Sequence, residues 1–141
     1  MALFGWFGRK PAPVASISHD RLGTLNWSDA QNEWLGSAGG LAFSIAYEGT
    51  PMPSPELLAY AQRMLLDASP LAGALQAEKA AMRIEFPLNA GEIDRLFYEQ
   101  VGLSRHKGKN RVFAMLGPDN DERAWRIEFG EDECEGLGFD S

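Results

Sequence analysis

The chain has 141 residues, an apolar fraction of 45%, a charged fraction of 23% and a net charge of -7. This length suits one ordinary domain, and no run of residues approaches the roughly 18 apolar residues of a membrane span. A single cysteine excludes an internal disulfide and a cysteine-rich zinc site. We therefore expect one soluble, cytoplasmic domain with no integral membrane segment.

The first 18 residues are expected to form a flexible tail, followed by a single domain over residues 19–141. Prolines and glycines interrupt the aromatic residues of this tail, and no hydrophobic period is sustained. Its opening, "MALFGWFGRK", offers aromatic and basic side chains that could touch anionic lipid headgroups. A membrane-peripheral accessory protein therefore remains an alternative.

Three strands are predicted before the first helix. The runs "RLGTLNW" and "EWLGSA" flank the polar turn "SDAQN", which is typical of a hairpin. In the next run, "LAFSIAYEG", large apolar residues alternate with the small residues Ala42, Ser44 and Ala46. We expect the small-residue face of this strand to lie under a helix.

Two helices are predicted in the middle of the chain. Ser54 is a good N-cap, and Pro55 suits the first helical position. A second cap-plus-proline signal, at Ser69 and Pro70, indicates that another helix begins there and ends between Arg83 and Phe86.

The segment "NAGEIDRLFYEQVGLSR" has features of both helix and strand. Asn89 and Glu92 have the spacing of a capping box, whereas "LFYEQVGLS" is aromatic and ends beside the turn "HKGKN". We favour a strand from about Leu96 to Arg105.

The last segments, "RVFAMLG" and "RAWRIEFG", flank "PDNDE" and predict a hairpin with Trp125, Ile127 and Phe129 facing inward. The complete order is β-β-β-α-α-β-β-β, with a further strand at the end as an option. It indicates an α+β fold: an antiparallel sheet of about six to seven strands with a central pair of helices packed on one face.

No constellation of residues points to catalysis, a metal or a cofactor. His19, His106 and Cys134 are far apart in the sequence, and the carboxylates beside Cys134 disfavour its thiolate. Glu92 and Asp94 could do acid-base chemistry only if they were buried together. We expect no catalytic residue, and an enzyme with a site between the helices and the sheet remains an alternative.

The acidic residues gather at the end of the chain. Residues 119–141 contain nine acidic residues and two arginines, which accounts for the whole net charge. This asymmetry argues against nucleic acid and favours a basic protein partner, although a solvated sheet edge explains it equally well. The candidate partner-binding residues, chosen by charge, are Asp119, Asp121, Glu122, Glu131, Asp132, Glu133 and Glu135.

The stretch "HDRLGTLNWSDAQNEWLGSAGGLAFSIAYEG" contains L-G-x-L and, after a polar turn, W-x-G. It resembles the opening of a set of small uncharacterised bacterial α+β domains, and the similarity covers most of residues 19–140. The resemblance implies an α+β domain without an established catalytic motif. It also implies that relatives of this kind are often encoded near polymorphic toxins, where some are regarded as immunity proteins. The expected function is therefore an immunity-type inhibitor of a basic toxin. A homodimer through a sheet edge or the helical pair is also compatible with the pattern.

Overall fold

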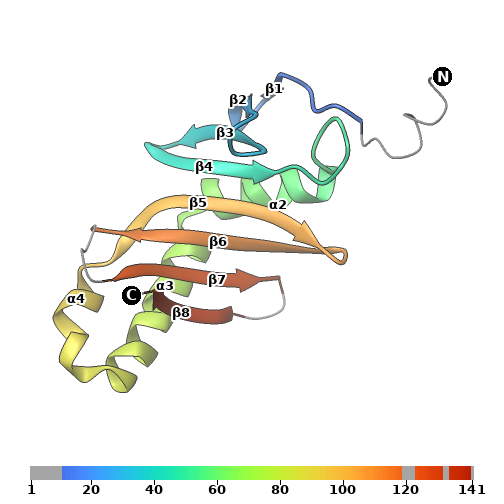
Figure 1. The fold of residues 1–141 in the computed structure, drawn as a ribbon. Coiled ribbons are helices and arrows are strands. Elements are labelled where there is room, and N and C mark those ends of the chain that lie inside the picture. The colour runs from blue at the N-terminus through green and yellow to red at the C-terminus, as the bar shows by residue number, and fades with distance from the viewer. Residues whose placement is uncertain (1–10, 119–122, 132–133, 141) are drawn as a thin grey trace.

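The computed structural model describes residues 11–118, 123–131 and 134–140. Within these residues, eight strands form one sheet whose spatial order follows the sequence (Figure 1). The helices lie between the fourth and fifth strands, which confirms the predicted α+β fold. The strands are β1 (Ser16–His19), β2 (Gly23–Ser28), β3 (Glu33–Ala38), β4 (Leu41–Ala46), β5 (Phe97–His106), β6 (Lys109–Gly117), β7 (Ala124–Gly130) and β8 (Cys134–Asp140). The helices are α2 (Pro55–Leu66), α3 (Ala68–Glu85), the 3-10 turn η1 (Pro87–Asn89) and α4 (Ala90–Asp94).

The sheet consists of two antiparallel halves, β1 to β4 and β5 to β8, joined side by side. The junction is a parallel pair, β4 and β5, in which Ser44 stands opposite Gly102. Parallel neighbours need a long crossover connection, and α2 and α3 supply it here. The sequence pattern did not indicate this parallel pair.

Two tight turns set the register within the halves. Gly39 and Gly40 connect β3 to β4 with φ angles of 56° and 83°. Lys107 and Gly108 connect β5 to β6 with φ angles of 51° and 77°. Two successive positive φ angles are the signature of the type I′ turn, whose twist matches that of a hairpin. The predicted turn "HKGKN" is thereby confirmed.

Helix α2 begins as the sequence predicts. The Ser54 hydroxyl accepts a hydrogen bond of 3.2 Å from the backbone N–H of Leu57, and Pro55 occupies the first turn. Helix α2 packs against β5 and β6, whereas α3 packs against β8. The end of α3 at Glu85 falls within the predicted range.

The region between α3 and β6 contains both predicted alternatives in succession. Residues Ala90–Asp94 are helical, and the strand β5 follows from Phe97 to His106. The preferred strand from about Leu96 to Arg105 is therefore confirmed, and the helical signal belongs to the short α4 before it.

The domain begins before the predicted boundary at residue 18. Residues 16–18, expected in the tail, belong to β1, and Ile17 is buried opposite Leu25. The preceding Val14 donates a hydrogen bond of 2.9 Å to the Pro51 carbonyl and accepts one of 2.9 Å from Trp34 Nε1. This segment joins the core because Ile17 is buried in it and the partly buried Val14 packs against it. The membrane prediction for "MALFGWFGRK" lies outside the described residues.

The two faces of the sheet differ in their cover. Helices α2 and α3 lie behind the sheet in Figure 1, over the face that carries the large apolar side chains. The predicted inward residues Trp125, Ile127 and Phe129 lie on this face and are buried. The small-residue face of β4, however, is on the uncovered side, so the expectation that it lies under a helix is wrong. Helices need bulky side chains to interdigitate with, and here the alternate residues Phe43 and Ile45 supply them.

Among the described residues, no helix combines the length and the apolar character that crossing a bilayer requires.

Candidate functional site

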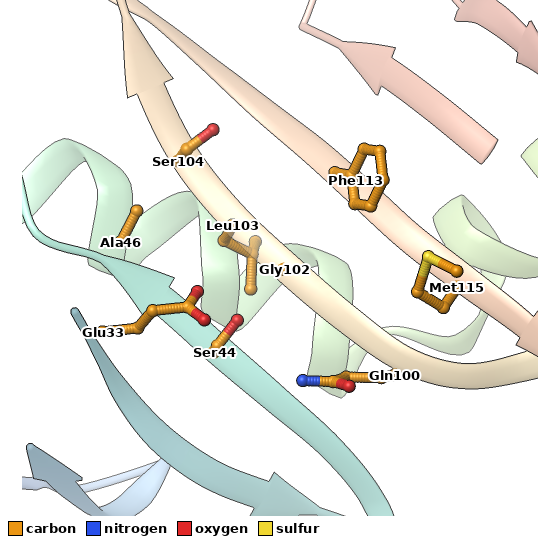
Figure 2. Close-up of a pocket in the computed structure, with 9 residues that line it drawn as sticks. All are labelled: Glu33, Ser44, Ala46, Gln100, Gly102, Leu103, Ser104, Phe113 and Met115. Atoms are coloured by element: carbon orange, nitrogen blue, oxygen red, sulfur yellow. The ribbon is translucent and has the colours of Figure 1, made fainter. Parts of the chain in front are cut away.

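A hollow on the uncovered face of the sheet is the first candidate site. It has a volume of about 250 Å³ and extends over four neighbouring strands, β3 to β6 (Figure 2). The residues that line it are Glu33, Ser44, Ala46, Gln100, Gly102, Leu103, Ser104, Phe113 and Met115.

The floor of the hollow lies at the parallel pair, where the two halves of the sheet meet. Ser44 of β4 stands opposite Gly102 of β5 in the register, and Phe113 is the next partner along the row. A Cβ atom added to Gly102 would lie 3.2 Å from the Phe113 carbonyl oxygen and 3.4 Å from Ser44 Oγ. The floor is therefore low because glycine and serine occupy it, and a larger residue at position 102 would raise it.

The walls on the two sides of this floor differ in chemistry. Phe113 and Met115 of β6 form an apolar wall, and the Phe113 side chain is 42% exposed. Glu33 stands on the β3 side, and Figure 2 shows its carboxylate directed toward Ser44. Three strand spacings, about 14 Å between backbones, separate β3 from β6. The hollow is thus apolar at one end and acidic at the other.

The polar lining consists of one carboxylate, two hydroxyls and one amide. Glu33 is the only ionisable residue among the nine, and no cation of the described chain lies within salt-bridge distance of it. Ser44, Ser104 and Gln100 offer neutral oxygens that accept hydrogen bonds. This arrangement is suited to receiving N–H groups and positive charge.

A second hollow, of about 190 Å³, lies beside α2 and has mixed charge. It is lined by Arg21, Gln62, Arg63 and Asp67, together with apolar atoms of α2. The Arg63 guanidinium carbon lies 5.2 Å from the centroid of the Tyr60 ring, a cation-π distance. Because the carboxylate of Asp67 borders the same space as the two arginines, this hollow favours neither sign of charge strongly.

Glu92 is the most strongly perturbed carboxylate among the described residues, and it has a structural role. It accepts hydrogen bonds from Arg123 Nη2 at 2.8 Å and Trp125 Nε1 at 2.7 Å. The Arg123 hydrogen bonds are the main cause that lowers the pKa of Glu92 to about 2. Asp94 pairs instead with Arg83. The two carboxylates therefore do not converge for acid-base chemistry, and Glu92 ties α4 to β7.

Glu131 is the one predicted partner-binding residue whose side chain the structure describes. It is exposed, and its carboxylate accepts a hydrogen bond of 2.6 Å from Asn110 Nδ2. Asn110 is buried and in turn accepts a bond of 2.8 Å from Arg105 Nη1. Glu131 is therefore held at the end of the sheet by this chain of hydrogen bonds.

Of the other predicted acidic residues, only Glu135 lies within the described part of the chain. Glu135 belongs to β8, whereas the rest lie outside the described residues: Asp119, Asp121, Glu122, Asp132 and Glu133. Their described neighbours Arg123 and Glu131 flank β7 at its opposite ends, and the strand between them is about 20 Å long. The acidic segments thus join the sheet at opposite ends, and whether they bind a partner stays a prediction.

Sequence reasoning missed the hollow, although part of its signal was visible. The alternation of Ala42, Ser44 and Ala46 identified a face of small residues, but not which side the helices would cover. Gly102 and Phe113 carried no signal of their own, because their approach to Ser44 depends on the pairing of strands about 58 residues apart in sequence. Only the parallel register brings these positions together.

No family model matches this chain, and no curated protein or solved structure is significantly similar to it.

Proposed function

We propose that this protein is a non-catalytic binding protein of the immunity type, which engages a basic protein partner through the uncovered face of its sheet. The observation that carries the proposal is the hollow between Glu33 and Phe113, an open depression with an apolar end and an acidic end. Antiparallel sheets often leave one face to solvent, but that face is usually polar. Here it carries exposed aromatic side chains.

The exposed apolar residues support a protein partner. Phe97 and Phe113 are 51% and 42% exposed, and both belong to the central strands β5 and β6. The Phe97 ring lies over Gly117, where an added Cβ would come within 2.8 Å of it. Exposed aromatic residues are enriched at protein interfaces, because they bury a large area for few rotatable bonds.

The size of the hollow supports a protein rather than a metabolite. Its volume of about 250 Å³ lies below the roughly 300–1,000 Å³ of typical small-molecule pockets. It suits one side chain that projects from a larger partner surface. The described lining offers its serine hydroxyls one carboxylate, Glu33, and no histidine, cysteine or lysine to act as a base. The small volume and this sparse set of polar groups support recognition rather than catalysis.

The charge of the chain supports a basic partner. A net charge of -7 would accelerate the encounter with a cationic protein. This acceleration would diminish as ionic strength rises, because salt screens the attraction. Inhibition of a basic toxin needs only a stable scaffold that covers the toxin's surface, without catalytic residues of its own.

Binding to the product of the adjacent gene, measured by calorimetry with full-length protein, tests the proposal. Phe113→Ala should weaken binding at least tenfold, because aromatic residues at the centre of an interface contribute strongly to affinity. A tenfold change in affinity corresponds to about 1.4 kcal/mol of binding free energy. The matched control is Leu88→Ala, which truncates a side chain that is 99% exposed in η1. It should leave the affinity unchanged.

Charge reversal at Glu131 and Glu135 separates the two candidate surfaces. If reversal abolishes binding while Phe113→Ala does not, the acidic carboxy-terminal edge is the interface and the uncovered face is not. Absence of binding at low salt would count against a basic partner altogether.

A further inference from the structure

We propose that the hollow accepts one long cationic side chain, an arginine or a lysine, with its charge at Glu33 and its aliphatic stem along the apolar wall. This inference rests on the proposed function, because the side chain would belong to the partner. It adds the chemistry that the partner must present at the centre of the interface.

The shape of the hollow fits such a side chain. The low floor at Ser44 and Gly102 runs between the apolar wall on β6 and Glu33 on β3 (Figure 2). A cationic side chain is itself apolar along its stem and charged at its head, so it matches both ends at once. A purely apolar side chain would displace water from the Glu33 carboxylate without offering it a hydrogen bond.

The charges around the hollow favour a cation over an anion. Glu33 is the only charged residue among the described residues of the lining, and none of the described residues forms an ion pair with it. An approaching anion would meet this carboxylate with no lining cation to offset it. A cation would gain a charge-assisted hydrogen bond there, in a partly enclosed site where water screens it less.

Neutral oxygens around the hollow complete the recognition. The hydroxyl of Ser44 lies on the floor near the Glu33 carboxylate, and Gln100 and Ser104 stand farther along β5 (Figure 2). Ammonium and guanidinium groups donate three and five hydrogen bonds respectively, so they need such additional acceptors. Arginine and lysine differ in geometry, since a planar guanidinium binds a carboxylate with two parallel hydrogen bonds.

The test uses small probes with the isolated full-length protein, so it does not depend on knowing the partner. N-acetyl-arginine amide and N-acetyl-lysine amide are added to the protein up to about 20 mM, and the backbone amide chemical shifts are followed by NMR. This concentration is chosen because a single side chain is expected to bind with about millimolar affinity. The neutral controls are the citrulline and norleucine amides. We expect saturable shifts at Ser44, Gly102 and Met115 with a cationic probe, and at least about threefold weaker binding of the neutral probes. The stronger of the two cationic probes identifies the preferred residue.

Two variants locate the binding. Glu33→Gln removes the charge and keeps the shape, and it should weaken the cationic probe about three- to fivefold, as expected for a partly exposed ion pair. Gly102→Ala should weaken both cationic probes by raising the floor. Because the added methyl group could also disturb β5, Glu33→Gln is the deciding variant.

The outcomes separate this inference from the proposed function. Equal binding of arginine and citrulline, unchanged affinity in Glu33→Gln, or no saturable shift in the wild type would each overturn the cationic site. In those cases a loss of partner affinity in Phe113→Ala would still support binding of the partner to the uncovered face. Conversely, a cationic probe could bind the hollow while Phe113→Ala leaves the affinity of the partner unchanged. That result would support the cationic site and contradict the proposed interface.

Discussion

The two faces of the sheet place similar side chains in opposite surroundings. Phe43 points to the helix-covered face and is 1% exposed, whereas Phe113 points to the uncovered face and is 42% exposed. Gly36 lies under the Phe43 ring, and Gly102 lies at the floor of the hollow. The comparison indicates that the covered face holds the fold together, whereas the uncovered face leaves an aromatic ring in contact with solvent, as the proposed interface requires.

The matched substitutions Phe43→Ala and Phe113→Ala test this difference most directly. Phe43→Ala should lower the free energy of unfolding by about 3–5 kcal/mol, because it removes buried area and leaves a cavity. Phe113→Ala should lower it by about 1 kcal/mol or less, since much of that ring already contacts water. Urea unfolding followed by tryptophan fluorescence measures both. Equal losses would mean that the uncovered face also carries the stability of the fold.

The ion pair at the edge of the covered face predicts a pH dependence. The pKa of Glu92 is lowered to about 2 in the folded protein, mainly by the hydrogen bonds from Arg123. The stability that this carboxylate contributes is therefore fully present above its unfolded pKa of about 4.5. It should be lost as the pH falls from 4.5 toward 2.

Glu92→Gln should remove this contribution. We expect the free energy of unfolding to fall by about 1–2 kcal/mol at pH 7, a range that allows for screening by solvent. The difference between wild type and variant should shrink as the pH falls below 4.5. Urea unfolding at pH 7, 4.5 and 3 measures it, with the exposed Glu85→Gln as the control. A difference that stays constant with pH would assign the loss to packing rather than to charge.

The smallest predicted effect concerns a polar group on the covered side. Tyr60 is 2% exposed, and its hydroxyl has no hydrogen-bond partner among the described residues. Burial is the main cause that raises its pKa. Tyr60→Phe should be neutral or raise the free energy of unfolding by up to about 1 kcal/mol, because it removes an unsatisfied buried hydroxyl. A clear destabilisation in thermal unfolding would show that this hydroxyl has a partner.

Local sequence patterns were enough for most elements of the fold. The cap at Ser54 and Pro55, the turn at Lys107 and Gly108, and the alternation in β7 each depend on residues that are near neighbours in the chain. Their energies are local, so their signals survive in the sequence. The same holds for the helices in the middle of the chain, which indicated the α+β class.

The candidate site had no comparable local signal. Ser44, Gly102 and Phe113 meet only because β4 and β5 pair in parallel after the long helical crossover. The predicted domain start after residue 18 was too late for a related reason. Val14 hydrogen-bonds to Pro51 and Ile17 pairs with Leu25, and neither contact joins near neighbours in the chain.

The sequence by itself therefore determined the helices, the hairpins, the inward residues of β7 and the concentration of acidic charge near the carboxy terminus. Only the tertiary structure decided which face of β4 the helices cover, and with it the position of the hollow. The physical reason is that alternation along a strand distinguishes two faces but does not say which one meets another layer. That choice depends on the summed packing of distant elements, here the apolar faces of α2 and α3 against the large side chains of the sheet.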